Sequence, residues 1–172
     1  MRYTYLGPSG TFTESALLSV PGASDAERIP ATSVPDALAR LNAGEADAAM
    51  VPIENSVEGG VSATLDAIAA SEGVRIIREV LVPIRFVLVA AKPISIEDVK
   101  TISTHSHAWA QVRGWAQENV PAAAYLPGSS TAAAAVGLIE EGCTYDAAIC
   151  SPALLNYHPE LHVLQDNIGD NK

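Results

Sequence analysis

The sequence of 172 residues has few basic residues, few cysteines and no long apolar run. Its 10 Lys and Arg stand against 20 Asp and Glu, and the net charge of −10 argues against nucleic acid or an anionic membrane as a partner. No apolar stretch reaches the roughly 18–20 residues of a membrane-spanning helix, because Pro83 and Arg85 interrupt the longest candidate, residues 80–91. Met1 and Arg2 lead into an expected strand without a signal-peptide pattern, so we expect a cytoplasmic protein.

The two cysteines and four histidines form no familiar metal-binding motif. Because nothing in the sequence indicates an oxidising compartment, we expect Cys143 and Cys150 to be free, buried thiols. His158 and His162 have the i, i+4 spacing of one helical face, but Pro159 lies between them and no HExxH pattern is present. We therefore predict that the protein holds no metal.

Segments typical of strands and of helices alternate along most of the chain, which predicts an α/β fold with parallel sheets flanked by helices. Strands are expected near residues 3–6, 27–31, 46–52, 74–90, 100–104, 122–126 and 145–150. Helices are expected near residues 11–20, 34–43, 59–71, 107–119, 131–141 and 152–157. Since residues 74–90 are too long for one strand and include Pro83, we expect them to cross from a first lobe to a second.

The two halves of the chain contain a loose internal repeat. In the first half, residues 32–44 predict a helix that starts at hydroxyl residues and ends at Gly44, followed by the strand DAAMVP. In the second half, residues 130–142 predict a similar helix that ends at Gly142, followed by DAAICSP. Each glycine fits the C′ position, which requires a positive φ. The repeat predicts two lobes of similar build, and the alternative is a chance likeness between αβ units.

Polar residues cluster after the strand that Pro52 ends, because proline lacks a backbone donor. Glu54, Asn55, Ser56 and Glu58 stand where a parallel sheet usually places its ligand, beyond the carboxyl end of a strand. The structural alternative is a capped turn, with Ser56 capping the next helix and Glu58 in its first turn.

A similar loop follows the strand expected at residues 3–6. Gly10 lets the backbone approach a ligand closely, and Thr11 or Thr13 caps the helix that follows.

Taken in order, these segments and three later ones resemble prephenate dehydratase, the enzyme family that converts prephenate to phenylpyruvate on the route to phenylalanine. The resemblance runs from about residue 3 to the end of the chain. Its motifs are GPSGTFTE (residues 7–14), VPIENSVEGGV (51–61), Ser103-Thr104-His105 with Gln111, Ser130-Thr131-Ala132, and Ile149-Cys150-Ser151-Pro152.

The alternation of elements and the resemblance both imply two αβ lobes with a central cleft, as in type II periplasmic binding proteins. We expect lobe 1 at residues 1–75, lobe 2 at 76–155, and a return segment toward lobe 1 at 156–172. The family also implies a homo-oligomer, a dimer or a tetramer, and a reaction that needs no metal or organic cofactor. Arogenate dehydratase, whose substrate carries an amino group, and a non-catalytic two-lobe protein that binds small anions are the alternatives.

The resemblance also assigns the site residues. Those expected to take part in catalysis are Asn55, Thr104, Gln111 and Glu54. Those expected to contact the substrate are Ser9, Gly10, Thr11, Phe12, Ser56, Gly60, His105, Ser130 and Thr131. The structural alternatives are an exposed helix residue for Gln111, a plain cap for Glu54, and a hydrogen-bonded core residue for His105, which otherwise suits a proton donor.

The chain departs from the family at two places. Ser106 and His107 occupy a stretch where the family usually has proline, which affects the shape of that loop. The family's catalytic domain ends in Thr-Arg-Phe, and this chain stops at residues 167–172, about where that motif should begin. We likewise expect the 172 residues to exclude the family's regulatory ACT domain, which binds phenylalanine. We therefore expect a fragment that folds at least partly, is nearly inactive and does not respond to phenylalanine.

Overall fold

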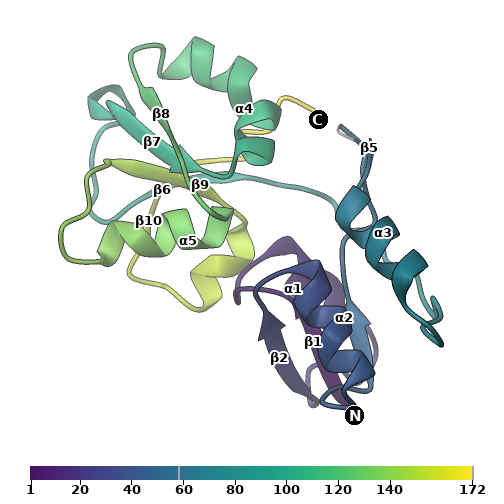
Figure 1. Ribbon diagram of the computed structural model, residues 1–172. Coiled ribbons are helices and arrows are strands. Elements are labelled where there is room, and N and C mark those ends of the chain that lie inside the picture. The colour runs from purple at the N-terminus through teal and green to yellow at the C-terminus, as the bar shows by residue number, and fades with distance from the viewer. Residues whose placement is uncertain (58, 172) are drawn as a thin grey trace. The chain divides into compact units, whose positions relative to one another are not determined.

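The computed structural model describes residues 1–57 and 59–171. The chain divides into two compact units, unit 1 up to Val82 and unit 2 from Pro83 onward (Figure 1). Both units combine helices and strands, so the predicted α/β class is confirmed. The division lies after Val82, whereas we expected it near residue 75. In the described part of the chain, no helix has the length and apolar composition needed to cross a bilayer.

Unit 1 contains a parallel three-stranded sheet with the order β2-β1-β3. Its strands are β1 (Arg2–Leu6), β2 (Glu27–Ala31) and β3 (Ala48–Met50). Its helices are α1 (Phe12–Leu18), α2 (Val34–Asn42) and α3 (Ser62–Ala70), and an antiparallel hairpin of β4 (Glu54–Asn55) and β5 (Gly59–Gly60) precedes α3. Tyr5, Leu17 and Ala23 form a buried apolar cluster that joins β1 to α1.

Local signals explain where the first two helices begin and where α2 ends. The Thr11 hydroxyl accepts a hydrogen bond from the Glu14 amide at 3.3 Å, so Thr11 rather than Thr13 caps α1. The Ser33 hydroxyl accepts one from the Asp36 amide at 3.2 Å and caps α2. Gly44 follows the cap residue of α2 with a φ of 71°, as the C′ position requires.

Unit 2 contains a mixed five-stranded sheet with the order β10-β6-β9-β7-β8. Its strands are β6 (Val87–Ala90), β7 (Thr101–Thr104), β8 (Ala124–Pro127), β9 (Ala147–Cys150) and β10 (His162–Asp166). Its α-helices are α4 (Ser106–Asn119) and α5 (Thr131–Val136), and its 3₁₀ helices are η1 (Ile96–Asp98), η2 (Gly137–Ile139) and η3 (Pro152–Asn156). β7 is parallel to β8 and β9, as the expected parallel sheet requires. The expectation is wrong for β6, which is antiparallel to both β9 and β10.

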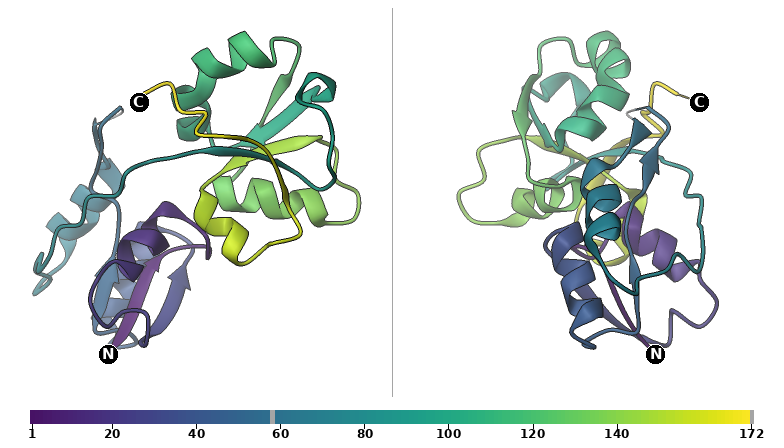
Figure 2. Two further views of the ribbon diagram at one scale, coloured as in Figure 1. Left: turned by 180° about the vertical axis from the view of Figure 1, so that it is seen from behind. Right: turned by 45° about the vertical axis from the view of Figure 1, so that its right-hand side comes forward.

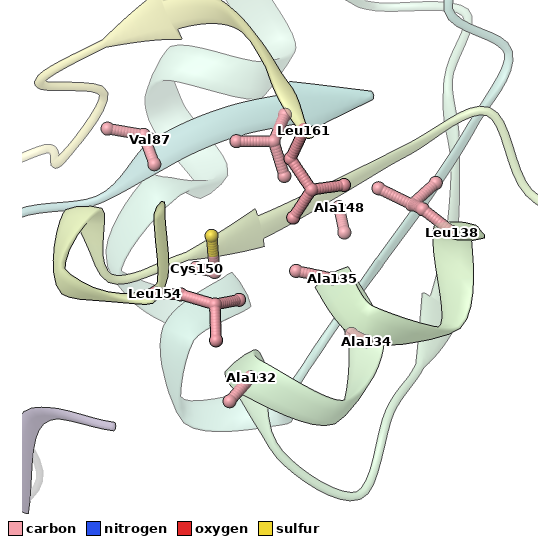
Figure 3. Close-up of a cluster of buried hydrophobic side chains, with 10 residues drawn as sticks. Val87, Ala132, Ala134, Ala135, Leu138, Ala148, Cys150, Leu154 and Leu161 are labelled. Atoms are coloured by element: carbon pink, nitrogen blue, oxygen red, sulfur yellow. The ribbon is translucent and has the colours of Figure 1, made fainter. Parts of the chain in front are cut away.

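The core of unit 2 lies where α5 and η3 pack against the sheet (Figure 3). Small side chains of α5 face β9, which allows the helix to lie close to the strand. The buried members of this cluster are Val87, Val89, Ala132, Ala134, Ala135, Leu138, Ala148, Cys150, Leu154 and Leu161.

The predicted internal repeat is confirmed by the topology. In each unit the first strand of a βαβαβ segment lies between the second and third, as β2-β1-β3 and as β8-β7-β9. The aspartates of the two DAA motifs, Asp47 and Asp146, also make equivalent contacts. Asp47 accepts a hydrogen bond from the Arg2 amide at 2.7 Å, and Asp146 accepts one from the Thr101 amide at 2.9 Å. Each carboxylate therefore holds the start of the neighbouring central strand.

Long-range pairing accounts for the differences from the expected strands. Of the strand expected at 74–90, only Val87–Ala90 is a strand, and residues 74–86 have no regular secondary structure. Residues 156–172, expected to return toward lobe 1, contribute β10 to the sheet of unit 2, where it pairs with β6. Neither β10 nor the β4–β5 hairpin was predicted, because a short strand is defined by a partner that the local sequence does not reveal.

Three predicted helices differ from the observed ones. The helix expected at 59–71 begins only at Ser62, and its cap position, Val61, makes no side-chain capping bond, so Ser56 does not cap it. The helix expected at 131–141 changes to 3₁₀ geometry after Val136, where the Tyr145 hydroxyl donates to the Ala134 carbonyl at 2.7 Å. The helix expected at 152–157 is the 3₁₀ helix η3.

Two smaller expectations change with these boundaries. Gly142 has a φ of 82°, but it lies beyond Glu140, the cap residue of η2, and is not its C′ residue. Cys150 is buried in β9 as expected, whereas Cys143 is exposed in the loop before that strand. Both cysteines are free thiols.

Candidate substrate site

In unit 1, the two loops with polar motifs leave the sheet at the same edge. β1 and β3 are parallel neighbours, with Tyr5 beside Met50. The loop at residues 7–11 follows β1 and the segment at residues 51–56 follows β3. Because the carboxyl ends of parallel strands share an edge, both predicted segments belong to one end of the unit 1 sheet.

The loop after β1 is held by a buried carboxylate, that of Glu14, which is only 3% exposed. One Glu14 oxygen accepts a hydrogen bond from the Gly10 amide at 2.6 Å, and the other accepts one from the Tyr5 hydroxyl at 3.1 Å. The Tyr5 hydroxyl also lies 3.0 Å from that of Ser9. Gly10 has a φ of 81°, a conformation that favours glycine, and the Thr11 hydroxyl donates to the Leu6 carbonyl at 3.3 Å.

The predicted residues of this loop are therefore brought together. Ser9, Gly10 and Thr11 form the turn, and half-buried Phe12 is the first residue of α1. Glu14 is not among the site residues predicted from the sequence. The signal was present, because Thr11 and Glu14 have the T-x-x-E spacing of a capping box.

The segment after β3 forms the β4–β5 hairpin. Asn55 Oδ1 accepts a hydrogen bond from the Val57 amide at 2.8 Å, which fixes the side chain in a local turn. This contact does not use the Nδ2 donors of Asn55. Glu54, Ser56 and Gly60 are exposed on the same hairpin, and Glu58 lies outside the described residues.

In unit 2, three loops leave the sheet at one edge. β7, β8 and β9 are parallel neighbours, with Thr104 beside Pro127 and Ser103 beside Ala148. The residues that follow these strands are His105, Gly128 to Thr131, and Ser151. This edge is the counterpart, within the internal repeat, of the polar edge of unit 1.

His105 and Gln111 lie on the first two turns of α4. His105 is the cap residue, and its Nδ1 accepts a hydrogen bond from the His107 amide at 3.3 Å. The His105 and His107 rings meet edge to face, with centroids 4.7 Å apart. Gln111 is half-buried, and its Nε2 donates to the His107 carbonyl at 3.0 Å. Gln111 is thus held against the turn that begins at His105.

Thr104 differs from the other predicted residues because its side chain points into the protein. It is fully buried, and its hydroxyl donates to the Ile149 carbonyl at 2.7 Å, which ties β7 to β9. Its carbonyl accepts hydrogen bonds from the Gly128 amide at 2.8 Å and from the Tyr125 hydroxyl at 3.2 Å. The structure therefore gives Thr104 a role in holding the edge together, and we do not propose it as a direct substrate contact.

The remaining residues of this edge form helix caps. The Ser130 hydroxyl accepts a hydrogen bond from the Ala133 amide at 2.9 Å and caps α5, whose first residue is the half-buried Thr131. The Ser151 hydroxyl accepts one from the Ala153 amide at 3.2 Å and caps η3. Gly128 leaves room for this arrangement, because a Cβ there would lie 3.1 Å from the Ala134 Cβ.

Burial controls the titration of two groups next to this edge. It raises the pKa of the Cys150 thiol to about 12, so Cys150 is protonated at neutral pH and is not a nucleophile. Burial also raises the pKa of Tyr125, which stacks on Trp109 with ring centroids 4.7 Å apart.

Within residues 1–57 and 59–171, no group of three or more His, Cys, Asp or Glu side chains is placed to hold a metal ion.

Comparisons with known proteins agree with the motifs. A family model described as prephenate dehydratase matches residues 3–172. Prephenate dehydratase from Amycolatopsis methanolica is 41% identical over 169 residues, which are 98% of this chain and 54% of that protein. The crystal structure of prephenate dehydratase from Arthrobacter aurescens, in complex with L-Phe, is 63% identical with a TM-score of 0.94, over 99% of this chain and 56% of that one.

A solved structure described as GqqA, a novel type of quorum quenching acylase, is 26% identical with a TM-score of 0.79, over 99% of this chain and 60% of that one. The chain therefore spans little more than half the length of these similar proteins.

Proposed function

Because this chain belongs to the prephenate dehydratase family, we propose that its parent protein, the full-length product of the gene that encodes it, converts prephenate to phenylpyruvate. The observation that carries the proposal is the position of the family's motifs. They follow neighbouring parallel strands at one edge of each unit's sheet, where α/β proteins bind ligands.

The proposed reaction removes the ring carboxylate as carbon dioxide and the hydroxyl across the ring as hydroxide, which takes up a proton to become water. Since the product ring is aromatic, the intrinsic driving force is large. The protein must orient the molecule, donate a proton to the departing oxygen and desolvate the leaving carboxylate.

The residues suited to these tasks are hydrogen-bond donors rather than a strong acid–base pair. We propose that the Nδ2 group of Asn55 and the fixed loop at Ser9 to Thr11 bind the substrate. We also propose that Gln111 binds the substrate and that His105 supplies the proton. These local donors must overcome the net charge of −10, which repels a dianionic substrate.

Product analysis separates this proposal from its alternatives. The parent protein is incubated with prephenate or with arogenate, and phenylpyruvate and phenylalanine are measured. We expect phenylpyruvate from prephenate, with activity retained in the presence of a chelator. A preference for arogenate would support arogenate dehydratase, and binding of either substrate without product would support the non-catalytic anion-binding protein.

We also propose that the parent protein is a homo-oligomer, a dimer or a tetramer, and that it acts in the cytoplasm, as expected of an enzyme of amino-acid biosynthesis. Sedimentation equilibrium tests the oligomeric state, and a monomer at all concentrations would contradict it. Fractionation of the source cells tests the location.

A further inference from the structure

Helix α4 contains a glycine at an unusual place. Gly114 lies in the interior of this 14-residue helix, where glycine costs about 1 kcal/mol relative to alanine. The neighbourhood of Gly114 explains the residue. A Cβ at this position would lie 3.0 Å from Oδ1, 3.2 Å from Cγ and 3.3 Å from Oδ2 of Asp170. Gly114 therefore leaves space for a carboxylate from the far end of the chain.

Asp170 uses that space to bond the helix backbone at three points. Its Oδ2 accepts a hydrogen bond from the Gly114 amide at 2.8 Å, and its Oδ1 accepts one from the Trp115 amide at 2.7 Å. Its own amide donates to the Gln111 carbonyl at 2.8 Å. In a regular helix the Trp115 amide would donate to the Gln111 carbonyl. Asp170 contacts both of these groups, at the turn that carries Gln111.

The segment that carries Asp170 is itself anchored in unit 2. β10 pairs with β6, and Asp166 at its end forms an ion pair with Arg85. Ile168 is completely buried, and its amide donates to the Phe86 carbonyl at 3.1 Å. From there the chain reaches α4, as both views of Figure 2 show for the yellow C-terminal segment. Asp170 is thus a fixed link between the sheet and the helix.

We propose that Asp170 is a positioning residue for substrate binding, acting through Gln111, an inference that rests on the proposed function. Asp170 holds the main chain of Gln111, while the bond from Gln111 Nε2 to the His107 carbonyl holds its side chain. Without the carboxylate, the Gly114 and Trp115 amides return to the carbonyls of their own helix. The helix persists, but the turn at Gln111 relaxes and the side chain leaves its fixed direction.

Steady-state kinetics of the parent protein test the inference. Asp170→Ala is expected to raise KM for prephenate about tenfold, the effect of losing a well-placed hydrogen bond to a charged ligand, with kcat changed less than about twofold. Asp170→Asn, which can accept only one of the two amides, should lie between Asp170→Ala and the wild type. Gly114→Ala should shift KM in the same direction, since its Cβ would displace the carboxylate. Glu118→Ala, an exposed charge on the same helix, is the matched control and should leave KM unchanged.

A double variant distinguishes an effect of Asp170 that acts through Gln111 from a general loss of structure. If Asp170 acts through Gln111, Asp170→Ala should add less than about twofold to KM when Gln111 is already alanine. A full tenfold increase in KM on adding Asp170→Ala to the Gln111→Ala variant would overturn the inference. A wild-type KM in the Asp170→Ala single variant would also overturn it, provided that Gln111→Ala alone raises KM. A parent protein without turnover, or a Gln111→Ala variant with wild-type kinetics, would overturn the proposed role of Gln111 and this inference together.

Discussion

The carboxylate of Glu14 accepts a 2.6 Å hydrogen bond from the amide of Gly10, four residues earlier, and both residues are buried. The bond fixes the loop after β1 in a conformation that includes the positive φ of Gly10. Since the same carboxylate accepts a bond from the Tyr5 hydroxyl, the loop, the strand and α1 are held by one side chain. The loop is therefore set before any ligand arrives.

Removing this carboxylate should destabilise the protein. Glu14→Ala leaves the buried Gly10 amide without its acceptor, which costs about 1–3 kcal/mol of unfolding free energy. Glu14→Gln keeps one acceptor oxygen and should lose less. Urea unfolding followed by circular dichroism measures the change, with Glu27→Ala on the exposed start of β2 as the control. Equal stability of Glu14→Ala and Glu27→Ala would show that the loop does not depend on this bond.

The two thiols should differ in reactivity. Cys143 is exposed, whereas Cys150 is buried with its pKa raised to about 12, so Cys150 remains a protonated thiol at pH 8. A disulfide reagent such as DTNB should titrate one thiol per native chain rapidly and the second only after unfolding. Cys143→Ser should abolish the rapid reaction. Two rapid thiols in the native chain would contradict the buried position of Cys150.

Asp146 should make stability depend on pH in the acid range. Its partial burial raises its pKa, but hydrogen bonds from the Thr101 hydroxyl and from the amides of Lys100 and Thr101 outweigh this and lower the pKa below 3.8. Because the folded state binds this proton less readily than the unfolded state, the contribution is fully present above pH 3.8 and is lost as the pH falls through the lower folded value.

Asp146→Ala should therefore lower the unfolding free energy at pH 7 by about 1–2 kcal/mol, less than the about 1.5–3 kcal/mol typical of hydrogen bonds to a charged group, because solvent screens this exposed carboxylate. The difference between variant and wild type should shrink as the pH falls below 3.8. Thermal unfolding over a pH series measures it, and Asp25→Ala, an exposed aspartate in unit 1, is the control. A difference that stays constant down to pH 2 would show that the charge of Asp146 is not involved.

Elements with local signals were predictable from the sequence. α2 was found because Ser33 and Gly44 mark its ends, and α4 because a strand and a polar cap precede it. The repeated DAA motif predicted two lobes of similar build, and the shared strand order of β2-β1-β3 and β8-β7-β9 agrees with that prediction. β10 was missed because it exists through its pairing with β6, more than 70 residues earlier in the chain.

The candidate site was predictable to a similar degree. Asn55, Gln111 and the Gly10 loop came from the family motifs, and the structure places them at the carboxyl ends of parallel strands or on the helix beyond. The inward direction of the Thr104 side chain could not be predicted. β7 is covered on both faces, so its consecutive residues are buried and no alternation of buried and exposed positions shows which way a side chain points. Asp170 gave no signal either, since it meets Gly114 across 56 positions of the sequence.

The rate of phenylpyruvate formation from prephenate, measured with the parent protein and with its Asn55→Ala and Gln111→Ala variants, tests the account most directly. We predict turnover by the wild type and a ten- to a hundredfold lower kcat/KM in each variant, because each loses a hydrogen bond to a charged ligand worth about 1.5–3 kcal/mol. Asn119→Ala is the matched control. Asn119 Nδ2 donates to the Trp115 carbonyl, four residues earlier in α4, just as Gln111 Nε2 donates to the His107 carbonyl. It should keep wild-type kinetics. A wild-type protein that forms no phenylpyruvate above the uncatalysed rate, or two site variants as active as the control, would contradict it.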